Sequence, residues 1–188
     1  KQPKKNSREP LSVEQINYLF EAADTLQYKV VLHLFYSCGL RRTEAQLLNI
    51  RDVHFREQLL YVREGKGSKR RVIPMTVKVT TDLENYYRNE RTYLKARNIQ
   101  DESAFMLNRW GNRMSGESYG ELLKTIIKKS IICHLSPVIS LHHLRHSIAT
   151  HLLQGGMGME YVRDFLGHRF LDTTLIYAKV NAAQIRLL

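Results

Sequence analysis

Residues 140–156 read SLHHLRHSIATHLLQGG, a pattern that predicts an amphipathic helix. Ser140 stands where a helix cap is expected, and the two final glycines are typical of a helix end. His142 and Arg145 are three residues apart, so they project together from one face of this helix. The apolar face, which is predicted to be buried, consists of Leu144, Ile148, Ala149, Leu152 and Leu153.

Helical patterns fill most of the remaining chain, and one short region has the pattern of strands. Strands are predicted at residues 58–63 and 69–75, joined by a Gly-Lys-Gly-Ser turn, with a third strand at 53–55. The expected helices cover residues 13–24, 28–38, a short segment carrying Glu44, 81–97, 118–131 and 159–166, and a last helix begins near Asp172. The predicted fold class is therefore mainly α with a small antiparallel β-sheet, an α+β domain.

The length of 188 residues fits one compact domain, which we place at residues 11–188. Residues 1–10 are polar and basic, and we expect them to be a linker from a preceding domain of a longer protein. Cys38 and Cys133 stand far apart in apolar surroundings. Both thiols are expected to be reduced and buried.

The net charge of +11 is too large for a generic soluble enzyme and indicates a polyanionic partner. The basic residues lie in turns and between helices, as in residues 63–71, which favours nucleic acid over an acidic membrane surface. A basic surface that is merely solvated is the alternative. Because no segment has the apolar length of a membrane span, we expect a cytoplasmic protein without a membrane partner.

The segment Gly39-Leu-Arg-Arg-Thr-Glu44 places Arg41 at the start of a helix, with Glu44 one turn later on the same face. Glu44 could hold the Arg41 guanidinium in place. An ordinary surface ion pair is the alternative.

Lys66 stands between two glycines at the tip of the predicted hairpin, where the backbone can approach a ligand closely. Lys69, Arg70 and Arg71 follow it, so a hairpin that faces phosphates is one interpretation. A lysine that is only solvated is the other.

His142 and Arg145 could serve phosphate chemistry, whereas His142 and His146 could instead bind zinc. The chain has no Asp and Glu spacing suited to Mg²⁺, which disfavours a two-metal nuclease and makes arginines the candidate cations. A further motif, Leu166-Gly167-His168, precedes Tyr177 by nine residues, counted from the histidine.

Together these motifs resemble the catalytic domain of the tyrosine recombinases, the phage-integrase family. The family's boxes contain Gly-Leu-Arg-x-x-Glu, a hairpin lysine, His-x-x-Arg-His, Leu-Gly-His and a terminal tyrosine, in the order found here. Leu141 is a departure, because many members have proline before the box histidine. The family usually carries a helical DNA-clamping domain ahead of this one, and residues 1–10 would be the linker from it.

The resemblance implies that Tyr177 attacks a DNA phosphate to form a 3′-phosphotyrosine, without a metal or other cofactor. Arg41 and Arg145 would clamp the phosphate, and Glu44 would support them. Lys66 would protonate the leaving oxygen, His142 would handle the tyrosine proton, and His168 would bond the phosphate. The predicted DNA-binding residues are Arg42, Lys69, Arg70 and Arg71.

The implied partners are double-stranded DNA, further copies of the chain in a tetramer on two DNA sites, and accessory DNA-bending proteins. Relaxation of supercoiled DNA by a type IB topoisomerase is one alternative function. A DNA-binding module without catalytic activity is another, and it would have no reason to keep the complete set of active-site residues.

Overall fold

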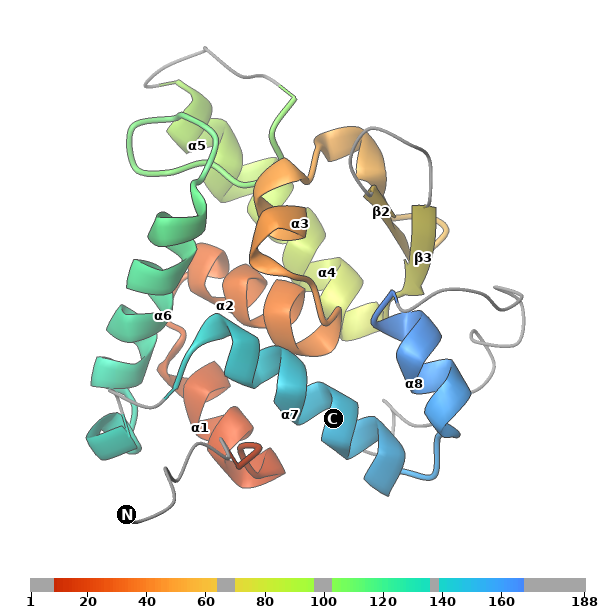
Figure 1. Cartoon of the computed structure of the whole chain (residues 1–188). Helices are drawn as coiled ribbons and strands as arrows, with labels where there is room; N and C mark the ends of the chain where they lie inside the picture. Colours follow the sequence, from red (N-terminus) through yellow and green to blue (C-terminus); the bar gives the residue numbers. More distant parts are fainter. Residues whose placement is uncertain (1–8, 64–69, 97–102, 136–138, 168–188) are drawn as a thin grey trace, which may run out of the picture.

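The computed structural model describes residues 9–63, 70–96, 103–135 and 139–167. It is mainly helical with one small antiparallel sheet, as predicted (Figure 1). Most of the predicted linker, the hairpin tip with Lys66, and the segment with His168 and Tyr177 lie outside the described residues. The elements are α1 Val13–Ala22, α2 Leu26–Leu32, η1 His33–Ser37, α3 Arg42–Leu47, η2 Ile50–Asp52, β1 Val53–His54, β2 Leu59–Arg63, β3 Arg70–Pro74, α4 Val77–Asn85, η3 Tyr86–Glu90, α5 Arg91–Lys95, α6 Gly116–Lys129, η4 Cys133–Leu135, α7 Leu141–Gln154 and α8 Met159–Phe165.

The sheet has the order β1-β2-β3, and both pairings are antiparallel. Leu60 faces Ile73 across the central pair, and both side chains are fully buried. The sheet lies at one side of the helical body, with α3 and α8 next to it (Figure 1). The predicted hairpin and third strand are thus confirmed in the described region.

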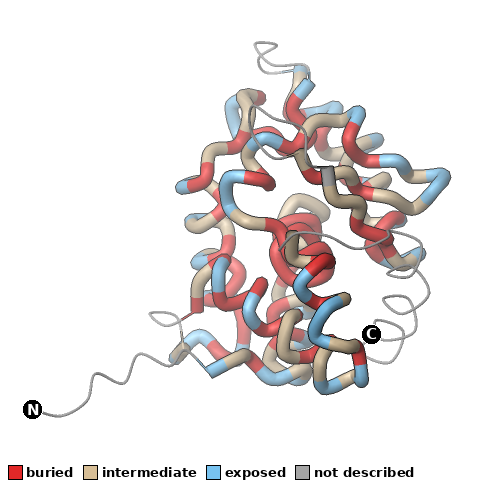
Figure 2. Tube along the Cα trace, turned by 45° about the vertical axis from the view of Figure 1, so that its right-hand side comes forward, coloured by how far each residue is buried: buried red, intermediate tan, exposed pale blue. Residues whose placement is uncertain are grey.

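Helix α7 carries a large part of the core, which Figure 2 shows as buried stretches running through the molecule. Leu144, Ile148 and Leu152 are buried as predicted, while Ala149 and Leu153 are partly buried. Ser140 occupies the N-cap position, but its side chain makes no capping hydrogen bond. The predicted face of α7 therefore meets the core, and polar residues of the same helix are buried as well, namely His143, Arg145, Ser147 and His151.

Two helices begin earlier than the apolar pattern indicates. The helix expected from residue 81 starts at Val77, because the Thr76 hydroxyl accepts a hydrogen bond from the Val79 amide. Helix α6 starts at Gly116 because Ser115 caps it in the same way. The prediction for the thiols was half wrong: Cys38 is buried, but Cys133 is exposed.

Gly39 connects the end of η1 to α3 and sets where α3 begins. Its φ is +58°, a conformation that favours glycine, and an added Cβ would lie 2.9 Å from Leu166 Cδ2. The turn therefore needs glycine for both conformation and space. Arg41 follows two residues after Gly39, at the N-cap of α3.

No helix within the described ranges has the length and hydrophobicity to cross a membrane.

Replacing Leu144 with alanine should destabilise the fold by about 2–5 kcal/mol, because it removes a fully buried side chain and leaves a cavity. Leu153→Ala, at a partly buried position of the same helix, is the matched control and should cost less. Urea unfolding followed by circular dichroism gives both free energies. Equal losses in the two variants would contradict the central position of α7.

Candidate active site

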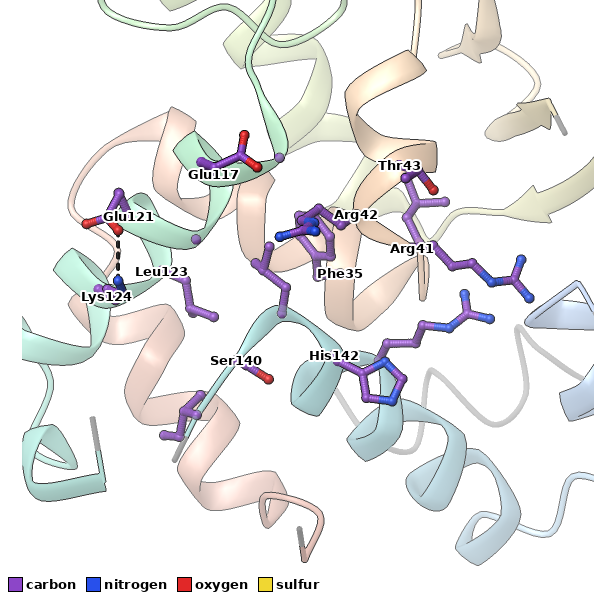
Figure 3. Close-up of a pocket in the computed structure, with 16 residues that line it drawn as sticks. Phe35, Arg41, Arg42, Thr43, Glu117, Glu121, Leu123, Lys124, Ser140 and His142 are labelled. Carbon is purple, nitrogen blue, oxygen red and sulfur yellow. Dashed lines mark hydrogen bonds and ion pairs between the residues drawn. The ribbon is translucent and has the colours of Figure 1, made fainter. Parts of the chain in front are cut away.

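A cavity of about 630 Å³ lies between α3, α6 and α7. Its lining includes Arg41 and Arg42 from the start of α3 and His142 and Arg145 from the start of α7. Figure 3 shows Arg41 and His142 approaching from these two elements, whereas Arg42 points toward α6. Residues about a hundred positions apart in the sequence thus line one cavity.

Arg41 is held by Glu44, as the sequence predicts. Its Nη1 donates to Glu44 Oε1 at 2.7 Å, and its backbone amide donates to Oε2 at 2.7 Å. The Arg41 side chain is 37% exposed, whereas that of Glu44 is only 6% exposed. The pair is therefore not an ordinary surface ion pair, because the carboxylate is buried and the guanidinium reaches the cavity.

Arg71 also reaches Glu44, a contact that the sequence analysis missed. Its Nη1 and Nη2 donate to the two carboxylate oxygens at 2.7 and 2.8 Å, and its Nε donates to the Phe165 carbonyl. A signal was present in the strand pattern. Arg71 lies opposite the buried Val62 and two residues before the buried Ile73, so it belongs to the inward face of β3.

Arg145 is nearly buried, with 8% of its side chain exposed. Its Nη1 donates to the Gly39 carbonyl, its Nη2 donates to the Leu166 carbonyl at 2.6 Å, and Nη1 lies 3.9 Å from Glu44 Oε2. Burial, together with the charges of Arg71 and Arg41, lowers the pKa of Arg145 to about 10. The group therefore stays protonated at neutral pH.

Glu44 is the carboxylate shared by these arginines, and we call Arg41, Glu44, Arg71 and Arg145 the Glu44 cluster. Burial opposes the ionisation of Glu44, but the hydrogen bonds and charge of Arg71, together with the hydrogen bonds from Arg41, outweigh it and lower the pKa to about 2. The cluster contains one negatively charged carboxylate and three positively charged guanidinium groups. The cluster therefore carries excess positive charge beside an open cavity, which suits an anionic ligand.

Arg42 packs against the first turn of α6, where a Cβ on Gly116 would lie 2.9 Å from Arg42 Cδ. It is exposed, so a contact with DNA stays a prediction. Arg70 belongs to β3, but its side chain, like Lys66, Lys69, His168 and Tyr177, lies outside the description. Within the described ranges, no three His, Cys, Asp or Glu side chains are grouped as metal ligands.

Residues 9–184 match the sequence profile of the phage integrase family. The tyrosine recombinase XerC of Chlamydia caviae is 36% identical over 178 residues, which are 92% of this chain and 54% of that protein. The tyrosine recombinase XerA of Pyrococcus horikoshii is 35% identical over 190 residues, 99% of this chain and 62% of that protein. The chain thus spans between about half and two thirds of the length of these curated relatives.

Solved structures have the same fold. The crystal structure of XerA recombinase matches with a TM-score of 0.73 and 23% identity, over 95% of this chain and 64% of that chain. The Tn1549 transposon integrase, in complex with transposon right end DNA, matches with a TM-score of 0.71 and 19% identity, over 100% of this chain and 67% of that chain.

The stability of the protein should fall as the pH drops from about 4.5 to about 2, because protonating Glu44 breaks its bonds to the arginines. Its folded pKa lies below the ordinary value, so the unfolded state binds more protons across this window and stability rises with pH. Glu44→Gln removes the titrating group and should give a shallower slope. Urea unfolding at several pH values measures this, and equal slopes in both proteins would contradict the assignment.

Proposed function

Because this chain belongs to the phage integrase family, we propose that it cuts and rejoins double-stranded DNA at specific sites, as a tyrosine recombinase does. The observation that carries the proposal is the cavity shared by Arg41, Arg145 and His142, with Glu44 buried behind the arginines. A phosphodiester needs cations on its non-bridging oxygens as charge builds in the transition state. Two guanidinium groups from different elements suit this task.

In the proposed reaction, the Tyr177 oxygen attacks the phosphorus while the bond to the 5′-oxygen breaks. The tyrosine proton passes to His142, and Lys66 protonates the leaving 5′-oxygen. The product is a 3′-phosphotyrosine and a free 5′-hydroxyl. A 5′-hydroxyl of a partner strand then reverses these steps, and the energy of the phosphodiester bond is kept in the phosphotyrosine.

Arg41 and Arg145 would bind the non-bridging oxygens of this phosphate, and His168 would add a hydrogen bond. The guanidinium group is planar and always charged, so it can give two parallel hydrogen bonds to a phosphate. Arg145 donates through Nη1 to the Gly39 carbonyl and through Nη2 to the Leu166 carbonyl. These two hydrogen bonds fix the orientation of its guanidinium group before the phosphate binds.

The DNA partner is supported by the net charge of +11 and by the similarity to the Tn1549 transposon integrase, whose structure is in complex with transposon right end DNA. Arg42, Lys69, Arg70 and Arg71 remain the predicted DNA-binding residues, although Arg71 is already engaged by Glu44. A tetramer on two DNA sites, helped by DNA-bending proteins, is part of the same proposal. Relaxation of supercoiled plasmid without strand exchange would instead support a type IB topoisomerase activity.

The wild-type protein should form a covalent adduct with a nicked suicide duplex of its target site in EDTA. The nick lets the short cleaved strand diffuse away, so that the phosphotyrosine accumulates. Tyr177→Phe should lose the adduct while keeping its affinity for the duplex. Denaturing gel electrophoresis detects the adduct.

An adduct that persists in Tyr177→Phe would assign the nucleophile to another residue. Cleavage that requires a metal ion and leaves no protein attached to DNA would contradict the proposed reaction altogether.

Arg41→Ala should lower the single-turnover rate of adduct formation by roughly 10²–10³-fold at saturating DNA, if Arg41 acts as one transition-state donor. Arg42→Ala is the neighbouring comparison, and it should weaken DNA binding more than it slows the bound complex. Rapid-quench kinetics and DNA titrations separate the two effects. An unchanged rate in Arg41→Ala at saturating DNA would remove Arg41 from the clamp.

A further inference from the structure

We infer that Arg71 is a positioning residue of this site, which fills acceptor sites on Glu44 so that this carboxylate does not draw Arg145, or more of the Arg41 guanidinium, away from the phosphate. The inference rests on the proposed function. Arg71 lies on β3, outside the cavity lining, so it would act through Glu44 and not by touching the scissile phosphate.

Four hydrogen bonds occupy the two carboxylate oxygens of Glu44. Oε1 accepts from Nη1 of Arg41 and Nη1 of Arg71, while Oε2 accepts from the Arg41 amide and Nη2 of Arg71. Each oxygen thus accepts two hydrogen bonds, which uses the acceptor sites of a carboxylate fully. Arg145, 3.9 Å from Oε2, is left to bond carbonyls and to face the cavity.

Removing Arg71 would also change the electrostatics around Glu44. The buried carboxylate would lose its bidentate partner and keep only the two hydrogen bonds from Arg41, and a buried charge that is incompletely compensated is unfavourable. Two guanidinium groups could replace it: that of Arg145, whose Nη1 lies 3.9 Å from Oε2, and that of Arg41, which already bonds Oε1. Either one would then be drawn toward Glu44 and away from the phosphate, and the cluster would also lose one positive charge.

Arg71 also joins three parts of the site: strand β3, helix α3 and the end of α8. Besides Glu44 on α3, it bonds the Phe165 carbonyl at the end of α8. Gly167 passes so close that an added Cβ would lie 2.7 Å from Arg71 Nη1, and its φ is +82°. Arg71 therefore fixes the hairpin strand against α3 and against the backbone that leads into the Leu-Gly-His motif.

The test compares Arg71→Met and Arg71→Lys with the wild type on the nicked duplex. Arg71→Met should slow adduct formation at saturating DNA by about 10–100-fold, the loss typical when a hydrogen-bonded support of a site residue is removed. Arg71→Lys keeps the charge and therefore the DNA affinity, but it cannot bond both oxygens in parallel, so its rate should recover only in part. Arg88→Met is the matched control, because Arg88 is exposed and pairs with Glu84 away from the site; it should keep the wild-type rate.

A double-mutant cycle with Glu44→Gln separates positioning from a general loss of structure. If Arg71 acts through Glu44, the double variant should be no slower than the slower single variant. Fully additive losses, or a wild-type rate in Arg71→Met, would overturn the inference. Should Arg71→Met fail to fold, the cycle is run with Arg71→Lys, where a full return to the wild-type rate would overturn it.

The same cycle is measured by urea unfolding, which does not depend on activity. Coupling between Arg71 and Glu44 in unfolding is expected, and its absence would overturn the inference even if the wild-type protein formed no adduct. A wild-type protein without an adduct would separately overturn the proposed function.

Discussion

The rest of the site depends on the hydrogen bonds that the buried carboxylate of Glu44 accepts from Arg41 and Arg71. This carboxylate ties together the start of α3, strand β3 and, at longer range, the start of α7. Buried arginines are stable only when their charges are compensated and their donors are used, and Glu44 together with the Gly39 and Leu166 carbonyls supplies both. The single carboxylate of Glu44 therefore helps to hold three arginines in place, and the cluster keeps a net positive charge.

Contacts set by local sequence were predictable. Arg41 is the N-cap residue of α3 and Glu44 is the third residue of that helix, while His142 and Arg145 are three residues apart within α7, so the placement of each pair follows from the geometry of its helix. The sheet and its turn followed from composition and alternation. Helix starts were less predictable, because a single hydroxyl at Thr76 extends α4 beyond its apolar pattern.

Contacts between distant segments were not predictable from motifs alone. The sequence predicts that Arg71 contacts DNA, because it follows other basic residues. In the structure it donates hydrogen bonds to Glu44 and to the Phe165 carbonyl. The alternation of β3 placed it on the buried face, but only the packing of β3 against α3 and α8 determines its partner. An arginine on the inward face of a strand thus indicates that a carboxylate from another segment lies next to it.

The most direct test of this account is a structure of the Tyr177→Phe protein bound to its nicked target duplex. We expect Arg41 and Arg145 to contact the same phosphate through its non-bridging oxygens while Arg71 stays bonded to both oxygens of Glu44. A target phosphate that lies outside the cavity of α3, α6 and α7, or a complex in which Glu44 bonds Arg145 instead of Arg71, would contradict it.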